Sequence, residues 1–178
     1  MTKNFLFSIF LILGAFGSAA FGQKIKGPPT PYVDKGACPF ECCTYREWTA
    51  NKPTAARRSM SDASPVSFRM KTGEKVVGVT GVVITTQPGI VRVLKKITLG
   101  KVKLNRGDEL FLLTYLGEGF SKIWFKGRIF EDAPYDESTF KLIRQPKSIW
   151  WVKIKNRRGQ IGWSRQPDNF DNKDQCGG

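Results

Sequence analysis

The chain of 178 residues contains no histidine, and this absence excludes several kinds of chemistry at once. Serine and cysteine nucleophiles activated by imidazole, and zinc held by histidine, all need that side chain. An enzyme would have to rely on carboxylates, and the densest acidic stretch, residues 131–137, is an isolated, proline-containing loop for which we expect no apolar wall. We therefore expect a solvated turn and no catalytic residue. A carboxylate-dependent hydrolase is only the third hypothesis.

Long apolar runs are also missing, apart from one at the N-terminus. Residues 5–16 are apolar except for Ser8, and the small residues 17–20 follow. This is the pattern of a signal peptide, with cleavage expected near Gly22/Gln23. The run is shorter than the roughly 18 to 20 residues that span a membrane, so we expect no transmembrane segment in the mature chain. An uncleaved N-terminal anchor is the alternative to a secreted or periplasmic protein.

Acidic residues are scarce, since 15 Asp and Glu stand against 29 Lys and Arg and the formal net charge is +14. A chain this basic is attracted to anionic surfaces. After export, those surfaces are peptidoglycan or another wall polymer, or an acidic protein or peptide. Export makes nucleic acid a less expected partner. The polar tail 168–174 lacks the glycine and the final glutamate of an EF-hand loop, and no cofactor or metal is expected.

Cysteine is limited to four residues, Cys38, Cys42, Cys43 and Cys176. An even number in an exported chain suggests disulfides, and three complete pairings are open. We favour a bond from Cys176 to one of the adjacent pair, because it would tie the tail to the start of the fold. A metal site made by all four thiolates is less expected, since the paired Cys-x-x-Cys spacing is missing.

Helical periodicity is absent between Ser64 and Trp163, where short runs rich in Val, Ile, Phe and Trp are broken by glycine. Such runs predict an all-β fold, a small barrel or sandwich. Aligning Gly73 with Gly107 superposes two strand-turn-strand patterns. The aligned pairs are Phe68 with Val102, Met70 with Leu104, Glu74 with Asp108 and Val76 with Leu110. The pattern predicts an internal duplication, with chance similarity as the alternative.

Three stretches, Leu104–Phe111, Trp150–Lys155 and Arg158–Trp163, together resemble a bacterial SH3-like domain. In that family a Gly-acid turn precedes a strand, and a Trp-Val-Lys strand leads into a closing Gly-Trp strand. The resemblance implies small β-barrels, two in tandem with irregular, disulfide-tied ends, that bind peptidoglycan or peptides without catalysis. The expected divisions are a signal peptide 1–22, an extended leader 23–37, a first module 38–88, a second module 89–166 with an inserted loop at 128–148, and a polar tail 167–178.

Two predicted strands place aromatic residues among cations. Because side chains alternate along a strand, each strand has one face that combines tryptophan with lysine, which can stack on a ring and attract negative charge. The candidate ligand-binding residues are Phe120, Lys122, Trp124, Lys126, Trp151, Lys153 and Lys155. Alternatively, the tryptophans are core residues between the modules. The leading hypothesis is a basic binding module of the cell envelope. The second is a structural or inhibitory envelope protein that occupies an acidic partner.

Overall fold

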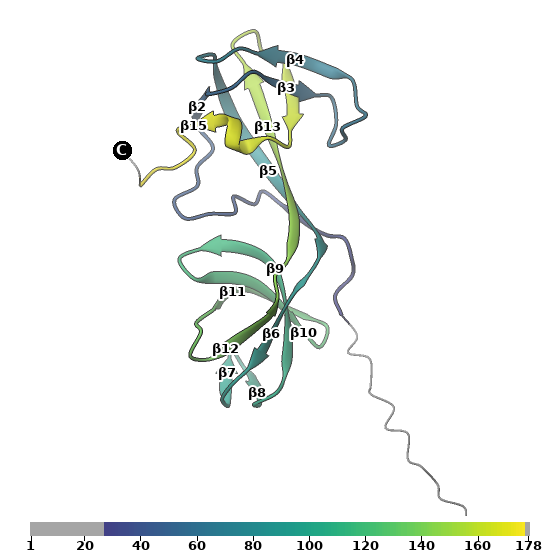
Figure 1. Ribbon diagram of the computed structural model, residues 1–178, viewed down its shortest axis with the longest axis vertical. Helices are drawn as coiled ribbons and strands as arrows, with labels where there is room; N and C mark the ends of the chain where they lie inside the picture. The colour runs from purple at the N-terminus through teal and green to yellow at the C-terminus, as the bar shows by residue number, and fades with distance from the viewer. Residues whose placement is uncertain (1–26, 177–178) are drawn as a thin grey trace, which may run out of the picture.

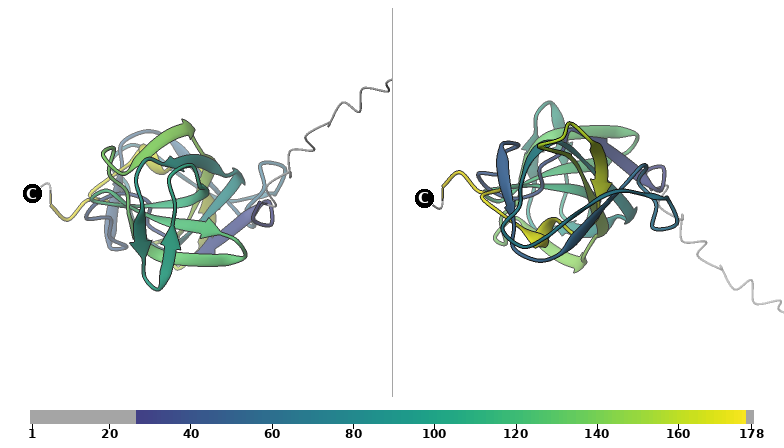
Figure 2. Two further views of the ribbon diagram at one scale, coloured as in Figure 1. Left: turned by 90° about the horizontal axis from the view of Figure 1, so that it is seen from below. Right: turned by 90° about the horizontal axis from the view of Figure 1, so that it is seen from above.

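The computed structural model describes residues 27–176, so the predicted signal peptide lies outside the described residues (Figure 1). The predicted all-β class is confirmed: the described chain forms strands and one short 3-10 helix. No helix within this range is long and apolar enough to cross a membrane. The strands gather into two curled, barrel-like units, which stand one above the other in Figure 1. Figure 2 looks along the long axis and shows the strands of each unit curling around a centre.

Unit one is built around a sheet with the strand order β15-β2-β5-β13-β14-β3-β4, and β1 pairs with β5 beside it. The bounds are β1 (Tyr32–Lys35), β2 (Glu47–Ala50), β3 (Thr54–Arg57), β4 (Val66–Met70), β5 (Lys75–Gln87), β13 (Lys147–Asn156), β14 (Ile161–Ser164), the 3-10 helix η1 (Pro167–Asn169) and β15 (Phe170–Asp171).

Unit two is a five-stranded sheet with the order β11-β10-β9-β6-β12, accompanied by the β7–β8 hairpin. Its bounds are β6 (Gly89–Val93), β7 (Ile97–Leu99), β8 (Val102–Leu104), β9 (Glu109–Gly117), β10 (Phe120–Phe125), β11 (Arg128–Pro134) and β12 (Phe140–Arg144). The long strands β5 and β13 connect it to unit one (Figure 1).

The two units are nested, which corrects the predicted tandem division. The chain leaves unit one along β5, builds all of unit two and returns along β13. Strand β13 pairs with β5, for example Trp150 with Val83, and β14 pairs with β13 and β3. The closing strands that were assigned to module 89–166 therefore complete unit one. The predicted inserted loop 128–148 forms β11, β12 and the start of β13.

The turns at Gly73 and Gly107 are equivalent, as the predicted duplication requires. Both glycines have positive φ, 84° and 94°, a conformation that favours glycine. In both turns the acidic side chain after the glycine accepts a hydrogen bond from the backbone N–H three residues before it. These donor and acceptor pairs are Lys71 with Glu74 and Asn105 with Asp108.

Strand pairing repeats in the same way. The register places Trp48 opposite Val76 in unit one and Val91 opposite Leu110 in unit two. The last strands match as well, as Phe170 pairs with Ala50 and Phe140 pairs with Val93. A β-bulge interrupts the β5–β13 pairing between Lys153 and Ile154, and another interrupts β9–β10 between Lys122 and Ile123. One strand pattern is therefore present twice, and the second copy is inserted into the first.

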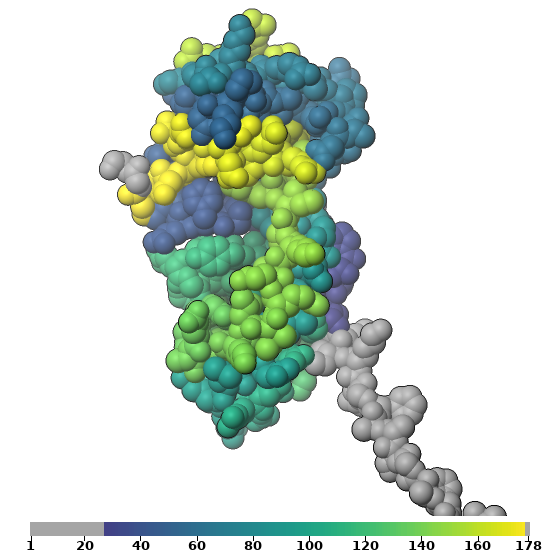
Figure 3. Space-filling view, in the orientation of Figure 1, coloured from purple at the N-terminus to yellow at the C-terminus, as the bar shows by residue number. Residues whose placement is uncertain are grey.

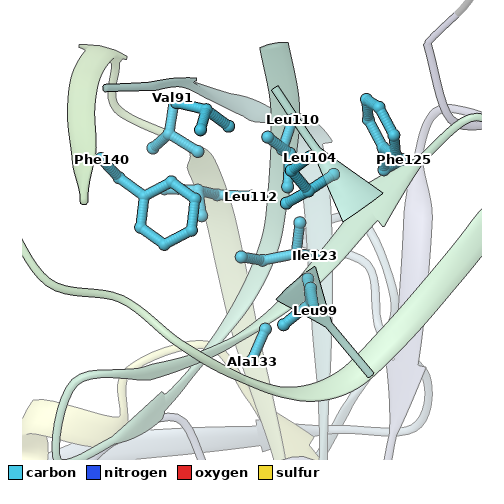
Figure 4. Close-up of a cluster of buried hydrophobic side chains, with 10 residues drawn as sticks. Val91, Leu99, Leu104, Leu110, Leu112, Ile123, Phe125, Ala133 and Phe140 are labelled. Carbon is cyan, nitrogen blue, oxygen red and sulfur yellow. The ribbon is translucent and has the colours of Figure 1, made fainter. Parts of the chain in front are cut away.

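Each unit has its own apolar core. Ile123 and Leu104 lie at the centre of unit two, surrounded by side chains from β6, β9, β11 and β12 (Figure 4). In unit one, Trp48 is fully buried, and a Cβ at Gly78 would lie only 2.7 Å from its ring. Position 78 therefore has to be glycine for this tryptophan to fit. Separate cores allow each unit to be stabilised by its own apolar burial.

Both ends of the described chain are more ordered than predicted. Cys42 pairs with Cys176, which confirms the favoured tie, and Cys38 pairs with Cys43. The predicted leader contributes β1 to the sheet, because its backbone pairs with β5. The predicted polar tail inserts Phe170 into the core of unit one. Figure 3 shows the tail lying across unit one, beside the loop that holds the first three cysteines.

The protein is expected to lose stability in strong alkali because the buried phenol of Tyr45 resists deprotonation. Burial raises the pKa of its phenol from 10.0 to about 12, and its hydroxyl donates a hydrogen bond to the Ala37 carbonyl. The folded chain keeps the proton while the unfolded chain releases it, so stability that is present below pH 10 is lost as the pH rises through 12. Urea unfolding on both sides of pH 10 measures this loss. Lysine side chains lose their protons in the same pH range. The wild type is therefore compared with Tyr45→Phe, in which the alkaline loss of stability should be smaller. An unchanged loss would contradict the assignment.

Candidate functional site

The predicted binding face on β10 is covered by the protein itself. Trp124 is only 8% exposed, and its ring packs edge-on against Phe111 at 5.5 Å. Tyr32, just after the proline-rich segment, packs on the same cluster. The prediction that Trp124 is an exposed stacking group is wrong, because the N-terminal segment lies over this face. Figure 3 shows that segment along the side of the molecule.

Lys122 of the same strand is engaged in structural ion pairs. Its ammonium lies 3.0 Å from the Asp34 carboxylate and 2.8 Å from that of Glu131. Burial disfavours the charge, but hydrogen bonds with Glu131 and Asp34 outweigh it and raise the pKa of Lys122. Two further predicted residues flank this group: Phe120 is half-buried, and Lys126 is exposed with its ammonium 4.9 Å from the Phe125 ring. No open aromatic and cationic surface results on β10.

The second predicted face, on β13, is partly confirmed in its geometry. Val152 and Ile154 are buried while Lys155 is exposed and Lys153 half-buried on the opposite side of the strand. Trp151, however, is only 4% exposed, so its predicted role as an exposed aromatic is wrong. The lysines point outward as alternation requires, but the tryptophan beside them is covered.

Trp163 supplies the accessible aromatic ring on this side of unit one. It lies on β14 directly opposite Lys153 and, on its other side, directly opposite Arg57 of β3. The Lys153 ammonium is 5.7 Å from the centre of the Trp163 ring. Directly paired residues share a face of the sheet, so the half-buried indole stands between two cations. Strand alternation could have identified Trp163, because it follows Gly162, which faces the inside of the unit.

The same face carries aliphatic side chains that are open to solvent. Val77 pairs with Lys155, which pairs with Ile161, so the three form one row across β5, β13 and β14. We call this surface the outer face of unit one, and its residues are Arg57, Val77, Val79, Lys153, Lys155, Ile161 and Trp163.

One hollow borders the outer face of unit one, and another lies at the turns near one end of the unit. One, of about 300 Å³, is lined by Trp163, Trp151 and Arg57 together with Arg165 and Asp62, which form an ion pair. The other, of about 650 Å³, lies between the turn at Gly73 and the turn from β13 to β14. Its charged lining residues are Arg69, Glu74, Lys75, Arg157 and Arg158. Within residues 27–176, neither Lys153, Lys155, Arg157 nor Arg158 forms an ion pair. These four cations therefore have no direct ion-pair partner within this range.

No protein-family model, curated protein or solved structure matches the chain. The function of the outer face therefore has to follow from its own chemistry. Unpaired cations around an accessible indole can attract and hold a partner that carries carboxylates or phosphates.

Another hollow, of about 730 Å³, has the opposite charge and lies between the cysteine loop and the tail. Its walls include Phe40 and Trp150, and three aspartates line its rim. Asp171 accepts a hydrogen bond from the Asn51 amide, and Asp168 lies 3.9 Å from the Lys173 ammonium. The hydrogen bond from Asn51 to Asp171 helps to hold the tail against unit one, so this hollow lies where the tail joins the fold.

The cysteines and two carboxylates of the acidic loop have partners within the fold. All four cysteines are in disulfides, which excludes a metal site made by their thiolates. In the acidic loop, Glu131 pairs with Lys122. Hydrogen bonds from Ser138 and Thr139 lower the pKa of Asp136, which closes the turn before β12. Glu131 and Asp136 thus have structural partners.

Proposed function

We propose that the protein is a non-catalytic binding protein of the bacterial cell envelope, and that the outer face of unit one holds an anionic partner. The observation that carries this proposal is the position of Trp163, accessible between Lys153 and Arg57 on a surface with few compensating acids. An aromatic ring supplies contact area at little entropic cost, while unpaired cations supply attraction. The chemistry needed from the partner is a run of carboxylates or phosphates.

The location follows from the sequence and the disulfides together. Two disulfides are typical of an oxidising compartment outside the cytoplasm. We propose that residues 1–22 are removed on export and that the mature protein starts at Gln23. In the envelope, wall polymers and acidic proteins are the available anions.

We also propose that both units are SH3-like barrels. The Gly-acid turn occurs in both copies at the predicted positions, and a short helical turn precedes the last strand of unit one. The Trp-Val-Lys strand and the Gly-Trp strand pair with each other, as they would in that family. Nesting of one such unit inside another departs from the tandem order that the resemblance implies.

The binding proposal is tested by removing charge from the outer face and from the adjoining turn between β13 and β14. The variant K153A/K155A/R157A should sediment with purified cell wall, or bind an immobilised acidic protein, about tenfold or more weakly at low salt. The difference should shrink as salt screens the charges. These side chains form no ion pair in residues 27–176, so stability should change little.

The matched control removes three exposed cations from unit two, in the variant K101A/K103A/R106A. Its net charge is identical, so general attraction to anions would weaken both variants equally. Equal losses would contradict a site on the outer face of unit one. A loss confined to the first variant supports it.

A further inference from the structure

The internal duplication assigns a counterpart in unit two to five of the seven residues of the outer face. The shared register and the shared bulge fix the correspondence. The equivalent pairs are Val77 and Phe111, Val79 and Leu113, Lys153 and Lys122, Lys155 and Trp124, and Ile161 and Ile129. In unit two this surface is occupied by the chain's own N-terminal segment, residues 27–34.

The occupied surface shows how such a segment is held. Gly27 lies against the Phe111 ring, where a Cβ would be 3.4 Å from the ring carbons. Tyr32 packs on the cluster of Phe111, Leu113 and Trp124. Two residues later, Asp34 forms its ion pair with Lys122 at 3.0 Å. On unit two, the extended, proline-rich segment is thus held by apolar contact and by one carboxylate on a lysine, while the pairing of β1 with β5 positions its last residues.

The equivalent surface of unit one has no such cover. Val77 and Val79 are 47% and 43% exposed, whereas Leu113 is 1% exposed under the segment. Lys153, the counterpart of Lys122, has no carboxylate partner among residues 27–176. The cross-strand neighbour of Lys153 is Trp163, whereas Lys122 has the carboxylate of Glu131 on its neighbouring strand.

We propose that the outer face of unit one docks an extended acidic peptide of a partner protein, in the way that residues 27–34 dock on unit two. This inference rests on the proposed function and names its partner class. The peptide places an apolar side chain on Val77 and Val79 and a carboxylate on Lys153. Since Lys155 replaces Trp124 and no acid replaces Glu131, the open face favours a more acidic peptide than the chain's own segment.

The test uses the mature protein and a labelled synthetic peptide, Gly-Pro-Pro-Thr-Pro-Tyr-Val-Asp-Asp, which is the sequence of residues 27–34 with one added aspartate. Fluorescence anisotropy measures its affinity. A control peptide with asparagine at both aspartate positions should bind about tenfold or more weakly, because a charged hydrogen bond is lost. The variant V79E/K153E should also bind the acidic peptide about tenfold or more weakly. The variant K101E/K103A, which makes the same change in net charge on unit two, should bind the peptide with an affinity close to that of the wild type. Thermal unfolding checks that both variants fold.

The outcomes separate this inference from the proposed function. Unchanged peptide affinity in V79E/K153E would overturn the inference, because the peptide would then bind elsewhere, for example by displacing the segment on unit two. If the peptide does not bind but cell-wall retention still depends on Lys153 and Lys155, the inference fails and the proposed function stands. Binding of anionic vesicles alone, with the same residue dependence, would assign the face to a membrane surface. No dependence on the face with any probe would overturn both.

Discussion

Replacing Cys42 and Cys176 together with serine is expected to lower the free energy of unfolding by about 5 kcal/mol. The two residues are 134 positions apart, so their bond closes a loop that includes almost the whole folded chain. A cross-link over so long a loop removes much of the conformational entropy of the unfolded state. The loss is a large share of the stability of an ordinary domain. Urea unfolding monitored by tryptophan fluorescence measures it.

The second disulfide is the matched control, because Cys38 and Cys43 are only 5 positions apart. On the same chain-entropy reasoning, the C38S/C43S variant should lose about 2 kcal/mol. Losses of equal size in the two variants would show that loop length does not govern the effect. A larger loss in C38S/C43S would mean that this short loop supports the fold mainly through its native contacts.

Replacing Trp124 with alanine is expected to cost about 3 to 5 kcal/mol of stability, because its ring is buried between unit two and the N-terminal segment. Affinity per folded molecule should stay unchanged. Trp163→Ala should behave in the opposite way. It should weaken binding by about 1 to 3 kcal/mol, as expected for an accessible aromatic anchor, and change stability much less.

Melting temperature and retention on cell wall or on an acidic protein, measured on the same two variants, separate these roles. Normal stability with weakened binding in Trp124→Ala would contradict the burial argument. Early melting of Trp163→Ala with unchanged affinity would remove Trp163 from the site.

Local signals in the sequence predicted most of the strands, the duplicated turns and the pairing of Cys176. A glycine followed by an acid has a local reason to form a turn, and alternating apolar residues have a local reason to form a strand. For that reason the alignment of Gly73 with Gly107 was confirmed at the two turns and in the strand that follows each turn. The position of Lys153 and Lys155 on an outward face was predicted on the same basis.

Long-range partners could not be read from the sequence. Strand β13 pairs with β5 across the whole of unit two, and nothing in its own residues distinguishes that partner from a nearer strand. The alternation of side chains along a strand predicts only that Trp124 and Ile123 lie on opposite faces of β10. Which side is covered depends on where residues 27–34 lie, and that is set by the pairing of β1 with β5. Tertiary contacts therefore decided which tryptophan remains accessible.

The insertion of unit two between β5 and β13 imposes an order on folding. In an unfolded chain, pairing these two strands means closing a loop over residues 88–146, which costs more entropy than closing a tight turn. In folded unit two the two ends of that loop already meet, since the Arg144 guanidinium donates to the Pro88 carbonyl at 2.9 Å and Gly89 packs against Pro146. Once unit two has formed, β13 can add to β5 as the second strand of a hairpin. We therefore expect unit two to fold before the pairing of β5 with β13 completes unit one, although unit one begins earlier in the chain.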